Sequence, residues 1–109
     1  MIEIIGIDTN IIIRAFKGDN ICINIINGKI PVISVITEIE LLSWPQLTEP
    51  DYNRLSSFVN ECFVIGLDNK IKSEVINLRK QFGLKIPDAI IAATAIQKDI
   101  PLFSADDIL

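Results

Sequence analysis

The sequence predicts an α/β domain in which a parallel four-stranded sheet lies between two layers of helices. Strands are indicated by short apolar runs at residues 4–7, 30–33, 63–65 and 102–103. Segments whose apolar residues recur at helical spacing separate these runs, and such alternation is typical of a parallel, three-layer α/β/α arrangement. The 109 residues, half of them hydrophobic, suffice for one domain with a core that needs no disulfide.

Side chains that can cap a helix mark where most of the helices are expected to begin. Ser34, Thr48 and Asp68 each offer an oxygen to the backbone N–H groups of a first turn. Gly83 can take the left-handed conformation that ends a helix. The helices expected on this basis cover about residues 10–16, a segment from the Gly18 break to 27, 34–43, 48–62, 68–83 and 86–96.

The most informative stretch is the first strand, because an apolar run that must be buried ends abruptly at Asp8, Thr9 and Asn10. In open α/β sheets ligands bind outside the carboxyl ends of the strands, and Asp8 would stand there. Asp-Thr-Asn is also a good helix start, so Asp8 by itself can be explained as a cap.

A second acidic residue lies at the start of the last helix. Asp88 follows Pro87 and precedes an Ala- and Ile-rich segment, whose small side chains allow close packing against a sheet. The helix dipole favours an anion at this position, so a structural role alone could again explain Asp88.

Taken together, Asp8-Thr9-Asn10 and the segment Pro87 to Ala95 resemble the PIN-domain nucleases, and most closely the VapC-type toxins. Two further stretches are similar to elements of that family. Residues 34–41 match its S-x-x-T-x-x-E-L element, and residues 102–106 match its late strand ending in T-x-D, with a serine for the usual threonine. The order of four acids is more specific than any single match.

The resemblance implies that four carboxylates are catalytic and bind metal: Asp8, Glu40, Asp88 and Asp106. Glu38 and Glu40 lie roughly 200° apart around a helix, so only one can face the site. Glu40 is preferred because the family's acid directly precedes a leucine. Asn10 and Ser104 are expected to position a water molecule or a phosphate oxygen.

Clustered carboxylates raise one another's pKa and need cations. Oxygen ligands without Cys or His suit Mg²⁺ or Mn²⁺, and such an ion can activate water for phosphodiester hydrolysis. The sequence has no histidine, which excludes a histidine base, a His-ligated zinc site and Ser-His-Asp or Cys-His catalysis. A receiver domain is disfavoured, because a single aspartate follows the first strand and no lysine follows the last one. A haloacid-dehalogenase-type phosphatase is disfavoured, because Asn10 stands where this class needs a second aspartate.

The net charge of −4 is unusual for a protein that binds nucleic acid. Removing the four proposed ligands from the 14 acidic residues leaves 10, which equals the number of Lys and Arg residues. The acidic excess is therefore expected to lie in the site. Arg14 and Lys85 are the best candidates for contacts with RNA phosphates, although an ordinary solvated charge is the more common role of such a residue.

Cys22 and Cys62 lie among apolar residues and are interpreted as reduced thiols rather than a disulfide. No apolar run approaches the roughly 20 residues that span a bilayer, and no signal peptide is recognisable, so a cytoplasmic location without membrane insertion is expected.

The resemblance implies an Mg²⁺-dependent endoribonuclease that a cognate antitoxin holds inactive and that commonly forms a homodimer. The alternative is a PIN-like module with a weak or inactive site that acts through RNA or protein contacts. Family members usually continue past T-x-D into a further strand, which the three residues after Asp106 cannot form. We therefore expect this strand to be missing, the sheet edge to be open and Asp106 to lie in a terminus that frays.

Overall fold

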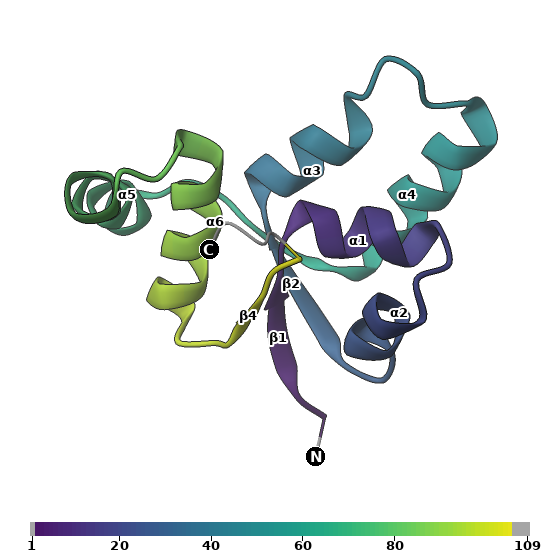
Figure 1. Cartoon of the computed structure of the whole chain (residues 1–109), viewed down its shortest axis with the longest axis horizontal. Helices are drawn as coiled ribbons and strands as arrows, with labels where there is room; N and C mark the ends of the chain where they lie inside the picture. Colours follow the sequence, from purple (N-terminus) through teal and green to yellow (C-terminus); the bar gives the residue numbers. More distant parts are fainter. Residues whose placement is uncertain (1, 106–109) are drawn as a thin grey trace.

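A computed structural model describes residues 2–105, and its sheet confirms the predicted class. All pairings among the four strands are parallel, and the strand order is β3-β2-β1-β4 (Figure 1). The strands are β1 (Ile4–Ile7), β2 (Ile30–Ser34), β3 (Phe63–Ile65) and β4 (Leu102–Phe103). β1 therefore lies at an inner position, between β2 and β4.

Six helices in the described part of the chain follow the predicted order. They are α1 (Thr9–Phe16), α2 (Asn20–Ile26), α3 (Val35–Leu42), α4 (Glu49–Glu61), α5 (Asn69–Phe82) and α6 (Ile86–Lys98). The predicted caps at Ser34, Thr48 and Asp68 are confirmed, since each side chain accepts a backbone N–H of its first turn. Gly83 ends α5 with a left-handed φ of 66°.

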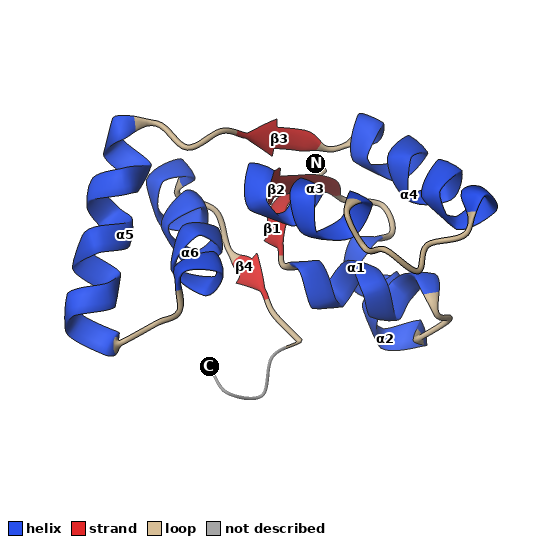
Figure 2. Ribbon diagram, turned by 90° about the horizontal axis from the view of Figure 1, so that it is seen from above, coloured by secondary structure: helices blue, strands red, loops and turns tan. Residues whose placement is uncertain are grey.

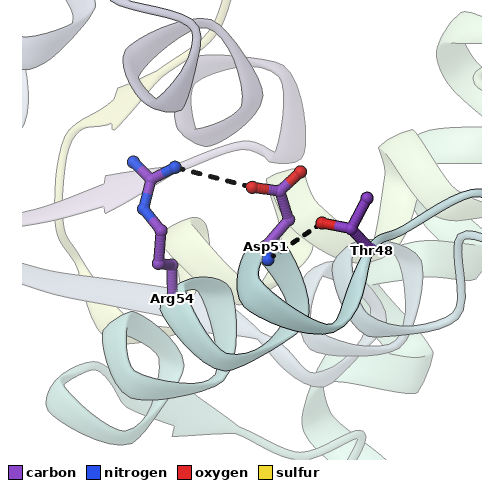
Figure 3. Close-up of polar contacts among 3 residues, drawn as sticks. All are labelled: Thr48, Asp51 and Arg54. Carbon is purple, nitrogen blue, oxygen red and sulfur yellow. Dashed lines mark hydrogen bonds and ion pairs between the residues drawn. The ribbon is translucent and has the colours of Figure 1, made fainter.

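The start of α4 shows how local these signals are (Figure 3). Thr48 Oγ1 accepts a hydrogen bond of 3.2 Å from the backbone N–H of Asp51. One turn further on, Arg54 lies 3.6 Å from the Asp51 carboxylate. Both partners of this ion pair are exposed, so the cap rather than the ion pair fixes where α4 begins.

Helices cover both faces of the sheet, as predicted for three layers (Figure 2). One hydrophobic cluster joins strand residues Ile5, Ile7 and Ile33 to side chains of α1, α2, α3 and α4. The other cluster holds α5 and α6 together and uses Ala89 and Ala93, so these helices approach closely. α6 also packs against β2 and α3.

The two cysteines are free thiols, as expected. Cys22 is buried in the first cluster, whereas Cys62 is only partly buried and donates a hydrogen bond to the Phe58 carbonyl. Burial raises the pKa of Cys22 and raises the pKa of Cys62 to about 12. Within residues 2–105, no helix is both long enough and apolar enough to cross a membrane.

Asp106 and the expected absence of a further strand lie outside the described residues.

Candidate active site

Asp8 stands directly after β1 and begins α1, at the carboxyl edge of the sheet. Its side chain is buried, with 7% of its surface exposed. Asp8 is the N-cap residue of α1, since its Oδ1 accepts a 2.9 Å hydrogen bond from the Ile11 N–H. Oδ2 accepts a 2.6 Å bond from the Ser104 hydroxyl and a 3.3 Å bond from the Ala105 N–H. Asp8 thus ties α1 to the segment after β4.

These contacts decide how much of the Asp8 carboxylate is available for chemistry. An ionised carboxylate offers about four lone pairs, two on each oxygen. The described donors take both positions on Oδ2 and one on Oδ1. On this count one lone pair on Oδ1 has no donor among the described residues. The three contacts hold the Asp8 carboxylate in its orientation.

Glu40 reaches the same edge from α3, the helix that follows β2. Its Oε1 lies 2.7 Å from the Thr9 hydroxyl, and Thr9 directly follows Asp8 in the chain. The Thr9 oxygen also lies 3.1 Å from Thr37 Oγ1. The structure therefore brings Glu40, rather than Glu38, next to the first turn of α1.

Asp88 lies in the first turn of α6. α6 leads into β4, which is parallel to β1, so α6 begins at the edge where the strands end (Figure 1). Asp88 does not cap the helix, because the N-cap residue is Lys85 and no side chain makes a cap hydrogen bond there. The favourable interaction of an acid with the helix dipole is therefore the structural reason for Asp88 here, as the sequence indicated.

The three described acids share one edge of the sheet without forming a compact cluster. Within residues 2–105, no group of three or more Asp, Glu or Cys side chains is close enough to hold a metal ion. The fourth proposed ligand, Asp106, lies outside the described residues. The donor set fits Mg²⁺ or Mn²⁺ in its chemistry, since the polar groups around Asp8 and Glu40 are oxygens of carboxylates and hydroxyls.

The other predicted site residues occupy different surroundings. Asn10 and Arg14 are exposed on α1, one in its first turn and one in its last. Lys85 is exposed where α6 begins. Ser104 touches Asp8 itself, so it orients the carboxylate, while its contact with water or phosphate stays a prediction.

Sequence reasoning missed Thr9 and Thr37 as site residues. The signal was present, because Thr37 and Glu40 are three positions apart on α3 and therefore share a helix face. Thr37 is fully buried, and a buried hydroxyl requires a hydrogen-bond partner. What the sequence lacks is any sign that this partner is Thr9, which lies 28 residues earlier.

A groove of about 250 Å³ lies between the later part of α1, α4 and the loop that joins α3 to α4, and none of the proposed site residues that the structure describes lines it. It is mainly apolar, with the Asp51 and Arg54 side chains of Figure 3 among its lining residues. Its remaining lining residues are Ile13, Phe16, Lys17, Leu41, Trp44, Gln46, Leu47 and Leu55. An apolar groove of this kind differs in character from the carboxylate edge and suits contact with protein rather than with phosphate.

Residues 5–109 match the model of the PIN domain, and the chain belongs to this family. A comparison with curated proteins finds no significant match.

Similar solved structures support the same fold. A toxin-antitoxin complex from Klebsiella pneumoniae contains a chain with 28% identity and a TM-score of 0.81, covering 90% of this chain and 82% of that one. VapBC2 from Rickettsia felis, bound to a DNA fragment from its promoter, gives 20% identity and a TM-score of 0.76, covering 94% and 99%. DNA-bound VapBC from Salmonella typhimurium gives 19% identity and a TM-score of 0.76, covering 95% and 86%.

Proposed function

We propose that this PIN domain is a metal-dependent endoribonuclease and the toxin of a toxin–antitoxin pair. The observation that carries the proposal is the pair of carboxylates, Asp8 and Glu40, held at the carboxyl edge of the sheet by side-chain hydrogen bonds. A site at this edge is where open α/β sheets bind their ligands. Membership in a family of nucleases supports hydrolysis of a phosphodiester bond.

Asp8, Glu40 and Asp88, together with Asp106, would hold Mg²⁺ or Mn²⁺, which when bound neutralises phosphate charge and lowers the pKa of an attacking water. Asp8 contributes the lone pair on Oδ1 that has no donor among the described residues. Glu40 has one oxygen engaged by Thr9, and its second oxygen can accept the proton that the water loses. Asn10, Ser104, Arg14 and Lys85 remain the proposed contacts for water and RNA phosphates.

Protein partners form the second part of the proposal. The similar solved structures are complexes of a toxin with its antitoxin, which supports a cognate antitoxin as the partner of this chain. The apolar groove that contains Trp44 offers a surface suited to a protein. We also propose that the chain acts as a homodimer.

The proposal is tested by incubating the purified protein with structured and unstructured RNA in Mg²⁺, in Mn²⁺ and in a chelator. Cleavage is expected only with metal, and Asp8→Asn or Asp88→Asn is expected to abolish it. Asparagine can still cap a helix, so Asp8→Asn is expected to keep the fold, which circular dichroism checks.

Metal should also raise the melting temperature of the native protein, because an ion that binds only the folded state stabilises it. Cleavage that persists in the chelator, or that survives both substitutions, would reject the mechanism. RNA or antitoxin binding without any cleavage would instead favour an inactive binding module.

A further inference from the structure

Two threonines connect the buried interior of the protein to the exposed carboxylate of Glu40. Thr37 is fully buried on α3, Thr9 is partly buried at the start of α1, and Glu40 is exposed. The Thr37 and Thr9 oxygens are 3.1 Å apart, and the Thr9 oxygen is 2.7 Å from Glu40 Oε1. The three side chains thus form a continuous chain of hydrogen bonds.

The direction of these bonds follows from counting protons. A hydroxyl has one proton to donate, and an ionised carboxylate can only accept. Thr9 must therefore give its proton to Glu40, at 2.7 Å, and the proton between the two threonines must come from Thr37. Thr37 cannot exchange this bond for one to water, because none of its surface is exposed.

A second buried threonine shows that this arrangement is not a general feature of threonines in helices. Thr94 on α6 is 3% exposed and donates to the carbonyl of Ile90, four residues earlier in its own helix. Thr37 has an equally buried position but is bonded to a side chain 28 residues away. Its hydroxyl joins two helices at the edge where both begin.

We propose that Thr37 and Thr9 are positioning residues that hold the Glu40 carboxylate in one orientation next to the first turn of α1. An exposed glutamate otherwise samples several rotamers, and fixing it costs conformational entropy. The relay from Thr37 through Thr9 restricts Glu40 before any ligand arrives. This inference rests on the proposed function for its consequence, which is that outer hydrogen-bond partners of a metal-binding carboxylate raise the affinity for the ion.

The first test needs no metal and therefore does not depend on the proposed function. Three-bond couplings measured by NMR report the χ1 rotamer of Glu40 in the wild-type protein and in Thr37→Val, Thr9→Val and Thr94→Val. Valine preserves the shape of threonine and removes the hydroxyl. One dominant rotamer is expected in the wild type and in Thr94→Val, and averaged couplings are expected in the other two variants.

The second test measures the Kd for Mn²⁺ by titration, with Glu40→Gln as a reference. Thr37→Val and Thr9→Val are expected to weaken binding by roughly 10- to 100-fold, as loss of an outer hydrogen-bond partner does in other metal sites. Thr94→Val is expected to bind like the wild type. Thr9→Ser retains a hydroxyl, so it is expected to bind Mn²⁺ much more tightly than Thr9→Val.

The possible outcomes separate the two proposals. If Glu40 keeps one rotamer in both Thr9→Val and Thr37→Val, the positioning inference is wrong. It is also wrong if Glu40→Gln weakens Mn²⁺ binding while Thr9→Val and Thr37→Val do not. A wild-type protein that binds no Mn²⁺ but shows the expected rotamer changes would contradict the proposed function and leave the positioning relay standing. Should Thr37→Val fail to fold, the Thr9→Val and Thr9→Ser pair decides alone.

Discussion

Two helices begin at the same edge of the sheet with an acid in or beside the first turn, yet the two acids are held differently. Asp8 is buried and accepts hydrogen bonds from Ile11, Ser104 and Ala105. Asp88 is partly exposed, and the start of α6 has no side-chain cap bond. Asp8 therefore serves the fold and the site at once, whereas Asp88 contributes little to the fold beyond the helix dipole.

The layers beneath these two helices differ as well. α1 lies on the larger cluster, where bulky side chains such as Ile12 are fully buried. α6 meets α5 largely through small residues, Ala89 and Ala93. Large buried side chains pack the layer next to Asp8, whereas small residues let α5 and α6 approach closely in the layer next to Asp88. Substitutions in the two layers are therefore expected to lower the free energy of unfolding by different amounts.

The largest expected effect on stability comes from the core beneath Asp8. Ile12→Ala is expected to lower the free energy of unfolding by about 2–5 kcal/mol, because it leaves a cavity among large buried neighbours. Ile71→Ala, at an equally buried site in the α5–α6 cluster, is expected to cost less, because that cluster is smaller and two of its buried members are alanines, so fewer large side chains surround the cavity. Urea denaturation of both variants measures the difference, and equal costs would contradict the comparison.

The comparison of the two acids predicts a smaller, unequal pair of effects. Asp8→Ala removes a helix cap and leaves the Ser104 and Ala105 donors without their acceptor, which is expected to cost about 2 kcal/mol. Asp88→Ala removes only a favourable charge near a helix start, which is expected to cost about 0.5 kcal/mol. Denaturation in a chelator isolates these terms from metal binding. If Asp88→Ala lowered the free energy of unfolding as much as Asp8→Ala, Asp88 would make a stabilising contact beyond its interaction with the helix dipole.

The smallest expected effect concerns Cys62, whose pKa is raised to about 12 by burial. In the unfolded chain the thiol titrates near its ordinary value of 9.0. The folded state thus keeps the proton longer, so the stabilising contribution is complete below the unfolded value and is lost as pH rises toward the folded one. At pH 8.5 native Cys62 is expected to react with iodoacetamide more slowly than in urea. Equal rates would contradict the burial.

Local sequence signals predict much of this fold. Ser34, Thr48 and Gly83 mark helix ends by their own chemistry, and the four apolar runs specify the strands without reference to the rest of the chain. The position of Asp8 follows equally directly, because a buried strand ends there. Family resemblance was needed to choose Glu40, since it and Glu38 lie in the same helix with similar neighbours.

The threonine relay was beyond such reasoning because it depends on contacts between distant segments. Thr37 looks like any threonine in a helix until β1 and β2 pair and bring α1 against α3. The contact between Ser104 and Asp8 likewise joins residues 96 positions apart. The role of Asp106 as a metal ligand stays a prediction, because this residue lies outside the described residues.

The central claim is that Glu40, hydrogen-bonded to Thr9 directly after Asp8 in the chain, belongs to the catalytic site. The most direct measurement compares metal-dependent RNA cleavage by Glu40→Gln and Glu38→Gln, two matched substitutions on one helix with the same change in charge. Glu38→Gln is expected to retain activity, because no hydrogen bond links Glu38 to the described site residues, and Glu40→Gln is expected to lose it. Activity retained in Glu40→Gln and lost in Glu38→Gln would contradict the account.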